Sequence, residues 1–407
     1  MNPEKCQPYP LKSSLGQPAE GKERYFSRPH ITRKICRAIN NGENILISAP
    51  RRIGKSSLLK DIQANYCPGF GSNAEQQPII KYMIIQSVDS GGLFFKKLYA
   101  KLIQDKAIFE GASGYFKNAS HAVRSAISKI SGISLEGIKI DAENSIDYFH
   151  ECFELIKQLK DKKIILIIDE FPDALNNIYK EERDLAIQFL QQHRDLRQQS
   201  SQINVQFIYT GSTGLRNVVT KIGKLDLIND IKEIELPPLD HNEAKCFIQC
   251  LELGYQLENQ GFELIPEQID YILEKITWNL PYYLQAIVYT LFEHFEDGNL
   301  ITISAIDEVL LSMTKAKSPY SPYFENWLQR LKKAFDNEEY ELAIKILNNI
   351  AIHHSIDKSK LKELSKPYTN GIYKFIMQTL EYDGYINEQY QFNSVLLKTW
   401  WLENVVN

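Results

Sequence analysis

The stretch that decides the fold is residues 44–59, NILISAPRRIGKSSLL. It begins with an apolar run of strand length, continues through a short basic loop, and reaches Gly-Lys-Ser-Ser at the start of a second apolar run. A strand, a glycine-containing loop and a helix in this order direct backbone N–H groups and the positive end of a helix dipole toward an anion. The pattern therefore predicts a phosphate-binding loop.

The residue types of this loop fit a nucleotide triphosphate with Mg²⁺. Gly54 lets the backbone approach the phosphates, Lys55 would reach the β and γ phosphates, and Ser56 would ligate the metal ion. Ala49 replaces the first glycine of the usual G-x-x-x-x-G-K-[ST], which matters only if that position needs positive φ. The predicted nucleotide-binding residues are Ala49, Pro50, Arg51, Arg52, Ile53, Gly54, Lys55, Ser56 and Ser57. Arg51 and Arg52 would add charge toward phosphate or a neighbouring subunit, unless they are simply solvated.

A second group of polar residues follows two other apolar runs. KIILIIDEF, residues 163–171, ends its aliphatic run in Asp169 and Glu170, and FIYTGS carries Thr210 and Ser212. Acids at the carboxyl end of a parallel strand lie where such sheets bind ligands. Asp169 would hold Mg²⁺, Glu170 would polarise the attacking water, and one of the two hydroxyls, with Ser212 preferred, would sense the γ phosphate. The alternatives are that the acids cap the following turn and that Thr-Gly-Ser only forms a turn.

The order of elements predicts an α/β fold with a parallel sheet. Four apolar runs of strand length are separated by amphipathic helical stretches, and this alternation places helices on both faces of a parallel sheet. The predicted strands are residues 44–49, 80–87, 163–169 and 204–211, and the predicted helices between them are 56–66, 92–106, 146–160 and 181–198. A small hairpin is expected at residues 133–141.

The chain of 407 residues is long enough for several domains. We expect an extended N-terminal arm at residues 1–20, a P-loop ATPase core at 21–238, a helical lid at 239–314 and a winged-helix domain at 315–407. Two prolines in IELPPLD mark the start of the lid, and a polar link, KSPYSPYFENW, precedes the last domain.

Composition narrows the choice of partners and compartment. The formal net charge of −4 gives no global basic field that would favour nucleic acid. The N-terminus lacks the apolar stretch of a secretory signal, and the longest apolar runs are too short to cross a bilayer. We therefore expect a cytoplasmic protein with no membrane partner.

Seven segments together resemble one family. YFSRP, SAPRRIGKSSLL, ILIIDEFPDAL, LRQQ, VQFIYTGSTGL, LPPL and NLPYYLQ stand in the order and spacing of archaeal-type ATPases. That family belongs to the STAND branch of the AAA+ group and is related to origin-recognition-like ATPases. The likeness spans roughly residues 20–400. It implies an ASCE sheet, bound ATP or ADP with Mg²⁺, a nucleotide at the junction of sheet and lid, and self-association.

The resemblance also implies further site residues. By position, Tyr25 and Arg28 would lie near the adenine, and Pro281 would help to read the base. Arg197 would be the arginine finger, which stabilises charge on the transferred phosphoryl group, with Arg194 and Arg216 behind it. The alternative is that Arg197 belongs to an ordinary amphipathic helix.

The lid motif departs from the family pattern. Asn279 takes the place of the glycine in Gly-x-Pro, and asparagine tolerates the left-handed backbone that a helix break needs. The segment NLPYYLQA contains no cation that could act as a second phosphate sensor. Slow ATP turnover is the expected consequence.

The preferred function is an ATP-hydrolysing molecular switch whose nucleotide state controls partner or oligomer interactions. The main alternative is a DNA-binding ATPase that uses its winged helix on duplex DNA. The predicted recognition helix carries only Lys374, and the wing NEQYQFN has no cation, although four lysines between residues 358 and 366 could touch a DNA backbone. A third possibility, an inactive nucleotide-binding scaffold, is disfavoured by the intact Glu170.

Overall fold

The computed structural model describes residues 7–65, 78–118, 146–159, 162–199, 204–211 and 214–406. The expected hairpin at 133–141 and the predicted sensor Ser212 lie outside these described residues. Contacts group the chain into two units, which are described separately. The sheet unit comprises Arg28–Ser48 and Leu58–Glu235, and the helical unit comprises Met1–Ser27, Ala49–Ser57 and Leu236–Asn407.

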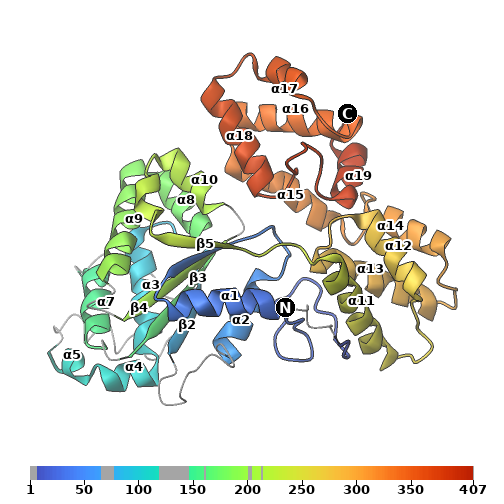
Figure 1. Cartoon of the computed structure of the whole chain (residues 1–407). Coiled ribbons are helices and arrows are strands. Elements are labelled where there is room, and N and C mark those ends of the chain that lie inside the picture. The colour runs from blue at the N-terminus through green and yellow to red at the C-terminus, as the bar shows by residue number, and fades with distance from the viewer. Residues whose placement is uncertain are drawn as a thin grey trace. The chain divides into compact units, whose positions relative to one another are not determined.

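The sheet unit is built on five parallel strands (Figure 1). They are β1 (Asn44–Ser48), β2 (Ile79–Ile84), β3 (Ile164–Asp169), β4 (Val205–Thr210) and β5 (Ile231–Glu235). Their order is β2-β3-β4-β1-β5, so β4 lies between β1 and β3, as an ASCE sheet requires. The predicted α/β fold of the P-loop type is therefore confirmed. Because all pairs are parallel, the carboxyl ends of β1, β3 and β4 share one edge.

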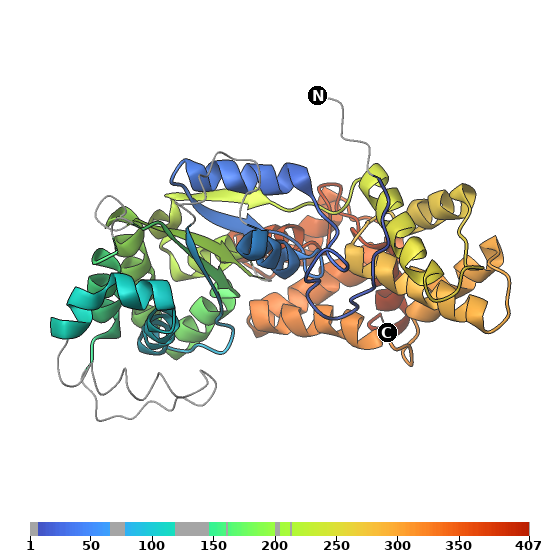
Figure 2. The ribbon, with the colours of Figure 1, turned by 90° about the horizontal axis from the view of Figure 1, so that it is seen from below.

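Alternating side chains divide the sheet into two buried faces. Leu46, Leu166 and Phe207 belong to one large apolar core together with the helices on that face. Ile45 and Ile208 are also fully buried but point to the opposite face, where α1 (Pro29–Asn40) contacts β1. Helix α1, coloured blue in Figure 2, covers one side of the sheet, and residues of α3 and α7 belong to the core on the other side. The continuous burial of β1, β3 and β4 is the reason their sequences are mostly apolar.

The remaining elements of this unit are helical. They are α2 (Lys55–Asn65, which starts in the other unit), α3 (Gly91–Ile103), α4 (Lys106–Gly111), α5 (Ser113–Asn118), α7 (Tyr148–Lys157), α8 (Phe171–Glu181), α9 (Arg183–Gln198), α10 (Leu215–Ile222) and the 3-10 helix η4 (Leu225–Ile228). Sequence reasoning did not predict α8, which begins immediately after the acidic pair at the end of β3.

The helical unit contains the four predicted lid helices. These are α11 (His241–Gln256), α12 (Pro266–Ile276), α13 (Pro281–Glu296) and α14 (Ile303–Met313). A capping box fixes the start of α11, because Asp240 accepts from the Glu243 N–H at 2.8 Å and Glu243 accepts from the Asp240 N–H at 3.1 Å.

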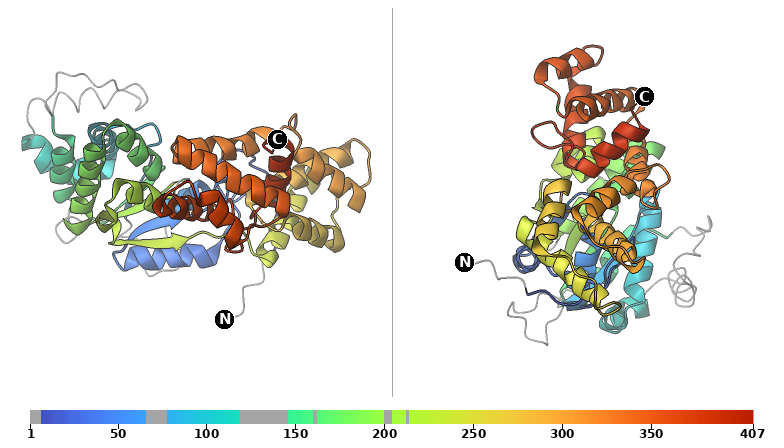
Figure 3. Two further views of the ribbon diagram at one scale, coloured as in Figure 1. Left: turned by 90° about the horizontal axis from the view of Figure 1, so that it is seen from above. Right: turned by 90° about the vertical axis from the view of Figure 1, so that its right-hand side faces the viewer.

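Five more helices follow along the chain, coloured orange to red in Figure 3. They are α15 (Ser321–Ala334), α16 (Asn337–His353), α17 (Lys358–Ser365), α18 (Asn370–Tyr382) and α19 (Val395–Asn404). Helix α15 occupies much of the stretch that the sequence suggested was a polar link. At the predicted wing, the structure has one isolated antiparallel bridge between Ile386 and Phe392.

The N-terminal arm lies along the lid helices of the same unit. The Leu11 N–H donates to the Cys250 carbonyl at 2.9 Å, and the Ser14 N–H donates to Gln285 Oε1 at 2.8 Å. Leu11 is 1% exposed, so the arm is anchored by an apolar side chain as well as by hydrogen bonds. In the described part of the chain, no helix has the length and apolarity needed to cross a membrane.

Candidate functional site

The predicted phosphate loop connects a buried strand to a helix start. Ser48 ends β1 and Lys55 begins α2, so the six residues from Ala49 to Gly54 form the connection. Gly54 has φ +99°, and a Cβ placed there would meet no atom within 4 Å, so its backbone is open to an approaching ligand. Ala49 is not among the positive-φ residues, so alanine replaces the usual glycine here without backbone strain.

Lys55 points back across the loop that precedes it. Its ammonium donates to the carbonyl oxygens of Ala49 and Pro50, each at 3.0 Å, and the residue is 8% exposed. A buried ammonium at the first position of a helix adds its charge to the positive end of the helix dipole. Both features favour an anion at the loop.

The two loop arginines are held by other parts of the helical unit and are not simply solvated. Arg51 donates from Nη1 to Asn326 Oδ1 on α15. Arg52 has left-handed backbone with φ +64°, donates to the Gly16 carbonyl at 3.3 Å, and places its guanidinium 5.1 Å from the centre of the Tyr282 ring. The arm, the lid and α15 thus each hold the loop through one of these contacts.

The arm also contacts the helix that follows the loop. The Ala19 N–H donates to Ser57 Oγ at 2.9 Å, so the second serine of Gly-Lys-Ser-Ser is held by the arm's backbone. Ser56, the predicted Mg²⁺ ligand, lies between Lys55 and Ser57 in the first turn of α2. The sequence did not reveal this role for the arm, because it depends on backbone groups.

The acidic pair stands at the carboxyl end of β3 in the sheet unit. Asp169 is 4% exposed; its Oδ1 accepts from the Glu170 N–H at 3.0 Å, and its Oδ2 accepts from the Tyr82 hydroxyl on β2. Glu170 has left-handed backbone, with φ 60° and ψ 34°, immediately before α8. A non-glycine residue in this conformation is strained, as is common for residues with a catalytic role. The sequence did not indicate the contact between Tyr82 and Asp169.

The end of β4 packs directly on this acidic pair. A Cβ added to Gly211 would lie 2.5 Å from Pro172 Cδ and 3.5 Å from Glu170 Oε2, so only glycine fits here. The preceding Thr210 is fully buried, and its hydroxyl has no hydrogen-bond partner among the described residues. Thr210 precedes Gly211 at the end of β4.

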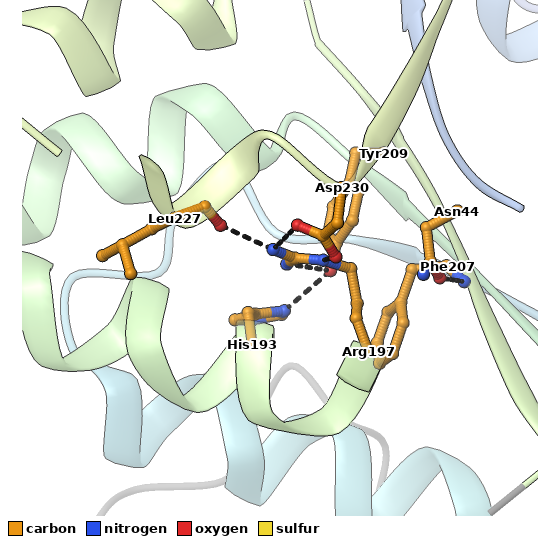
Figure 4. A network of polar contacts seen from close by, with 7 residues as sticks. All are labelled: Asn44, His193, Arg197, Phe207, Tyr209, Leu227 and Asp230. Carbon is orange, nitrogen blue, oxygen red and sulfur yellow. Dashed lines mark hydrogen bonds and ion pairs between the residues drawn. The ribbon is translucent and has the colours of Figure 1, made fainter. Parts of the chain in front are cut away.

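Arg197 is buried inside the sheet unit, which corrects its assignment as the arginine finger (Figure 4). Its side chain is 1% exposed and makes a bidentate ion pair with Asp230, with Nε–Oδ2 and Nη2–Oδ1 distances of 2.7 and 2.9 Å. It also donates to the Leu227 carbonyl at 2.6 Å and to the Tyr209 hydroxyl at 3.3 Å. A finger must reach a phosphate, whereas this guanidinium joins α9 to the segment before β5.

The same network contains a buried histidine. His193 Nδ1 lies 3.1 Å from the Tyr209 hydroxyl, and the residue is fully buried. Burial, and then the charge of Arg197, holds the pKa of His193 well below its usual 6.5. Burial would raise the pKa of Asp230, but its hydrogen bond and ion pair with Arg197 lower it below the usual value. The network is therefore a neutral histidine beside a satisfied ion pair.

The other two candidate fingers are more accessible. Arg194 is paired with Asp226 at 3.6 Å and its side chain is 27% exposed. Arg216 is paired with Glu233 at 3.3 Å and its side chain is 64% exposed. Arg216 is thus the arginine of the three that a neighbouring molecule could meet most easily.

Of the residues expected near the base, Arg28 and Pro281 lie at helix starts, and Tyr25 lies in the segment before α1. Arg28 is 5% exposed and precedes α1, and the Tyr25 carbonyl accepts from the Tyr9 hydroxyl at 3.0 Å. Pro281 is the first residue of α13. The left-handed residue at the helix break is Thr277, with φ 56°, and not Asn279 as the sequence suggested. Asn279 instead exchanges hydrogen bonds with Leu239, each at 3.1 Å.

The oxygen groups present fit Mg²⁺ bound together with a nucleotide. No group of three or more His, Cys, Asp or Glu side chains is placed to hold a metal ion within the described ranges. Mg²⁺ with a nucleotide needs no such group, because it is held by one or two protein oxygens, phosphate oxygens and water. The Asp169 carboxylate and the Ser56 hydroxyl have the oxygen chemistry that such a site would use.

No protein-family model matches the chain, and no curated protein matches it. Among solved structures, it is similar to the Walker-type ATPase paby2304 of Pyrococcus abyssi, at 16% identity and TM-score 0.60, covering 95% of this chain and 98% of that one. The ORC2 protein of Aeropyrum pernix, solved as ADPNP–ADP complexes, matches at 10% identity and TM-score 0.49, covering 93% and 92%. The ORC1 protein of the same organism, solved with DNA, matches at 10% identity and TM-score 0.38, covering 93% of each chain. The first comparison supports the P-loop ATPase fold, and the other two are too distant to carry an argument.

Proposed function

We propose that this chain binds and hydrolyses ATP and acts as a molecular switch. The observation that carries the proposal is the connection between β1 and α2, where Lys55 bonds back to the loop carbonyls and Gly54 leaves the backbone open. An anion-binding loop of this construction suits the phosphates of a nucleotide. The P-loop fold shared with a Walker-type ATPase supports the same assignment.

Each side chain has a defined part in this proposal. Lys55 and the loop N–H groups bind the outer phosphates, and Ser56 and Asp169 supply oxygens to Mg²⁺, which neutralises phosphate charge when bound. Glu170 orients and polarises the attacking water, because its strained backbone holds the carboxylate over the end of β4. Ser212 or Thr210 senses the γ phosphate, and the buried hydroxyl of Thr210 is unpaired in the described part of the chain, which suits that role.

The switch and its partners are further parts of the proposal. The arm, the lid and α15 contact the loop or the start of α2 through Arg51, Arg52 and Ser57. A change in the bound phosphates would therefore alter the contacts of all three elements. The partner is another protein or a second copy of this chain, and in the second case exposed Arg216 is the finger supplied to the neighbouring subunit. We also propose a cytoplasmic location, on the basis of the sequence alone.

The test compares nucleotide binding and phosphate release in two variants. Lys55→Ala should weaken ATP binding by at least about tenfold, because charge-assisted hydrogen bonds to the phosphates are lost. Glu170→Gln should bind ATP as wild type does and release no phosphate. Lys34→Ala, at an exposed position on α1, is the charge control and should match wild type in both assays. Unchanged ATP binding by Lys55→Ala would show that the loop is not the nucleotide site.

A further inference from the structure

Helix α15 carries a buried arginine, Arg330. Arg330 is 9% exposed, and both of its terminal nitrogens, Nη1 and Nη2, are buried with no hydrogen-bond partner among the described residues. Arginine remains charged at neutral pH, and a buried charge is costly unless it is paired and hydrogen-bonded. The guanidinium therefore has unused capacity to bind an anion.

Arg330 lies on the face of α15 that meets the phosphate loop. Asn326, four residues earlier and therefore on the same helical face, accepts the hydrogen bond from Arg51. A second contact joins the same regions, because a Cβ added to Gly384 would lie 3.4 Å from Pro50 Cβ. Tyr385, which follows Gly384, donates its hydroxyl to the Trp327 carbonyl of α15 at 2.7 Å. The loop, α15 and residues 384–385 thus pack together.

The charged groups around the Tyr385 hydroxyl are mostly positive. Burial raises the pKa of Tyr385, and the charges of Arg330 and Arg51 oppose that increase, so both guanidinium groups lie within electrostatic range of one hydroxyl. Asp383, which acts on the same hydroxyl, is the one acid among the charges that bear most on it. One carboxylate beside two guanidinium groups leaves a net positive charge.

We propose that Arg330 binds a phosphate group at the loop, and that this is the terminal phosphate of the bound nucleotide. The assignment rests on the proposed function and adds a residue from the C-terminal helices to it. A guanidinium pairs with phosphate through two parallel N–H···O bonds, which would satisfy both unpaired nitrogens. The lid segment NLPYYLQA contains no cation, so Arg330 would supply the one that the lid lacks. Helix α15 would then respond directly to the presence of the phosphate.

The experiment compares Arg330→Gln with Lys333→Gln, an exposed position on the same helix that undergoes the same change of charge. Calorimetric titrations with ATP and with ADP measure binding to each variant and to wild type. Arg330→Gln should weaken ATP binding about ten- to a hundredfold and ADP binding less. Lys333→Gln should bind both nucleotides as wild type does.

A second experiment uses inorganic phosphate alone and measures how far it shifts the thermal unfolding midpoint. If Arg330→Gln binds ATP normally but loses stabilisation by inorganic phosphate, the ligand of Arg330 is free phosphate. Equal responses of wild type and Arg330→Gln to all three ligands would overturn the proposal while leaving the proposed function intact. If wild type binds no nucleotide, the proposed function fails, and the midpoint shift with inorganic phosphate still decides whether Arg330 binds an anion.

The thermal unfolding midpoint without ligand shows whether the substitution itself impairs folding. Because Arg330→Gln removes an unpaired buried charge, its ligand-free midpoint should equal or exceed that of wild type. A large decrease would mean that the guanidinium is paired within the protein, which contradicts the proposal. Arg330→Lys should recover part of the ATP affinity, since an ammonium restores the charge but not the two parallel bonds.

Discussion

Single residues at the carboxyl edge of the sheet fit together with very little free space. Gly211 ends β4 against the Pro172 ring and the Glu170 carboxylate, while Tyr82 fixes one oxygen of Asp169. Gly211 is thus a steric requirement of the acidic pair as well as a turn residue. A small change there should alter the position of Glu170 without removing any catalytic group.

We predict that Gly211→Ala lowers both stability and ATP turnover. The new Cβ would lie 2.5 Å from Pro172 Cδ and 2.9 Å from Cγ, and a proline ring has little freedom to move. Overpacking of this kind costs about 1–3 kcal/mol of unfolding free energy. Gly92→Ala, where a Cβ meets nothing within 4 Å, is the matched control in the same unit and should not lose stability. Urea unfolding and phosphate release measure both effects; normal turnover in Gly211→Ala would mean that Glu170 is not held by this contact.

The buried His193 predicts a specific dependence of stability on pH. Its folded pKa lies well below the 6.5 of the unfolded chain, so below about pH 6.5 the unfolded state binds the extra proton. Stability should therefore fall with decreasing pH in that range, by at most about 1.4 kcal/mol per pH unit. Asp230 acts in a different pH range. Its lowered pKa adds stability above the unfolded value of about 3.8, and this contribution is lost as the pH falls below that value.

The measurement is the urea midpoint of wild type and of His193→Gln at about pH 7.5 and about pH 5.5. The variant keeps a side chain that can bond Tyr209 but has no group that titrates, so its midpoint should change less between the two pH values. His353→Gln, at an exposed position on α16, is the control and should retain the wild-type dependence. An unchanged dependence in His193→Gln would show that His193 does not cause the loss.

The sequence predicted these sites unevenly, for physical reasons. Lys55 and Asp169 follow from motifs, because phosphate and metal chemistry restrict the residue type and its spacing. The assignment of Arg197 failed because an amphipathic helix does not show which arginine pairs with an acid 33 residues later. The helix break depends on Thr277, a β-branched residue in left-handed backbone, which local preference argues against. Tertiary contacts decide such positions.

Among the elements, the N-terminal arm connects most directly to the phosphate loop. It is anchored where the Leu11 backbone crosses Gly254 on α11, and it ends on Ser57. We predict that Gly254→Ala displaces the arm, because the new Cβ would lie 2.1 Å from the Leu11 carbonyl oxygen. Trypsin should then cleave after Lys12 faster than in wild type, and ATP affinity should fall as Ser57 loses its partner.

The control for this element is Gly371→Ala on α18, where a Cβ would lie 3.9 Å from Thr369 Oγ1 in ordinary contact. It should leave cleavage after Lys12 and ATP affinity unchanged. Faster cleavage of Gly254→Ala with normal ATP affinity would mean that the position of the arm does not affect nucleotide binding. Unchanged cleavage would mean that the arm is held mainly by contacts other than its crossing of α11.

Elements with strong periodicity were predicted well, and weakly patterned ones were missed. The four predicted strands correspond to β1–β4. Burial on both faces makes β1, β3 and β4 mostly apolar, and the half-buried edge strand β2 still carries four apolar residues of six. Strand β5 was missed because it is an edge strand whose residues are mostly exposed or half-buried, so its sequence IKEIE looks polar. The Ser-Pro pairs at the start of α15 favour a link in the sequence, although proline suits the first turn of a helix.

At the scale of the whole molecule, charge is what distinguishes a protein partner from duplex DNA. The chain carries a formal net charge of −4, and duplex binding needs several cations that face phosphate. On α17, Lys360 is already paired with Glu363 at 3.0 Å. Residues 387–393, next to the isolated bridge, contain no lysine or arginine. These features favour a switch that acts on protein.

We therefore predict that duplex DNA leaves phosphate release from ATP within about twofold of its basal rate, and that the chain is not retained on DNA at about 50 mM salt. Glu170→Gln is the blank for the hydrolysis assay. Each phosphate contact would add about 0.9 to the slope of log affinity against log salt, so retention without salt dependence would not indicate binding to the DNA backbone. If DNA raised the rate several-fold in a salt-dependent manner, substitution of Lys358 and Lys362, both exposed on α17, would test whether that helix makes the contact. That result would favour the DNA-binding ATPase over the protein-facing switch, since a net negative chain gains such a response only through a local basic surface.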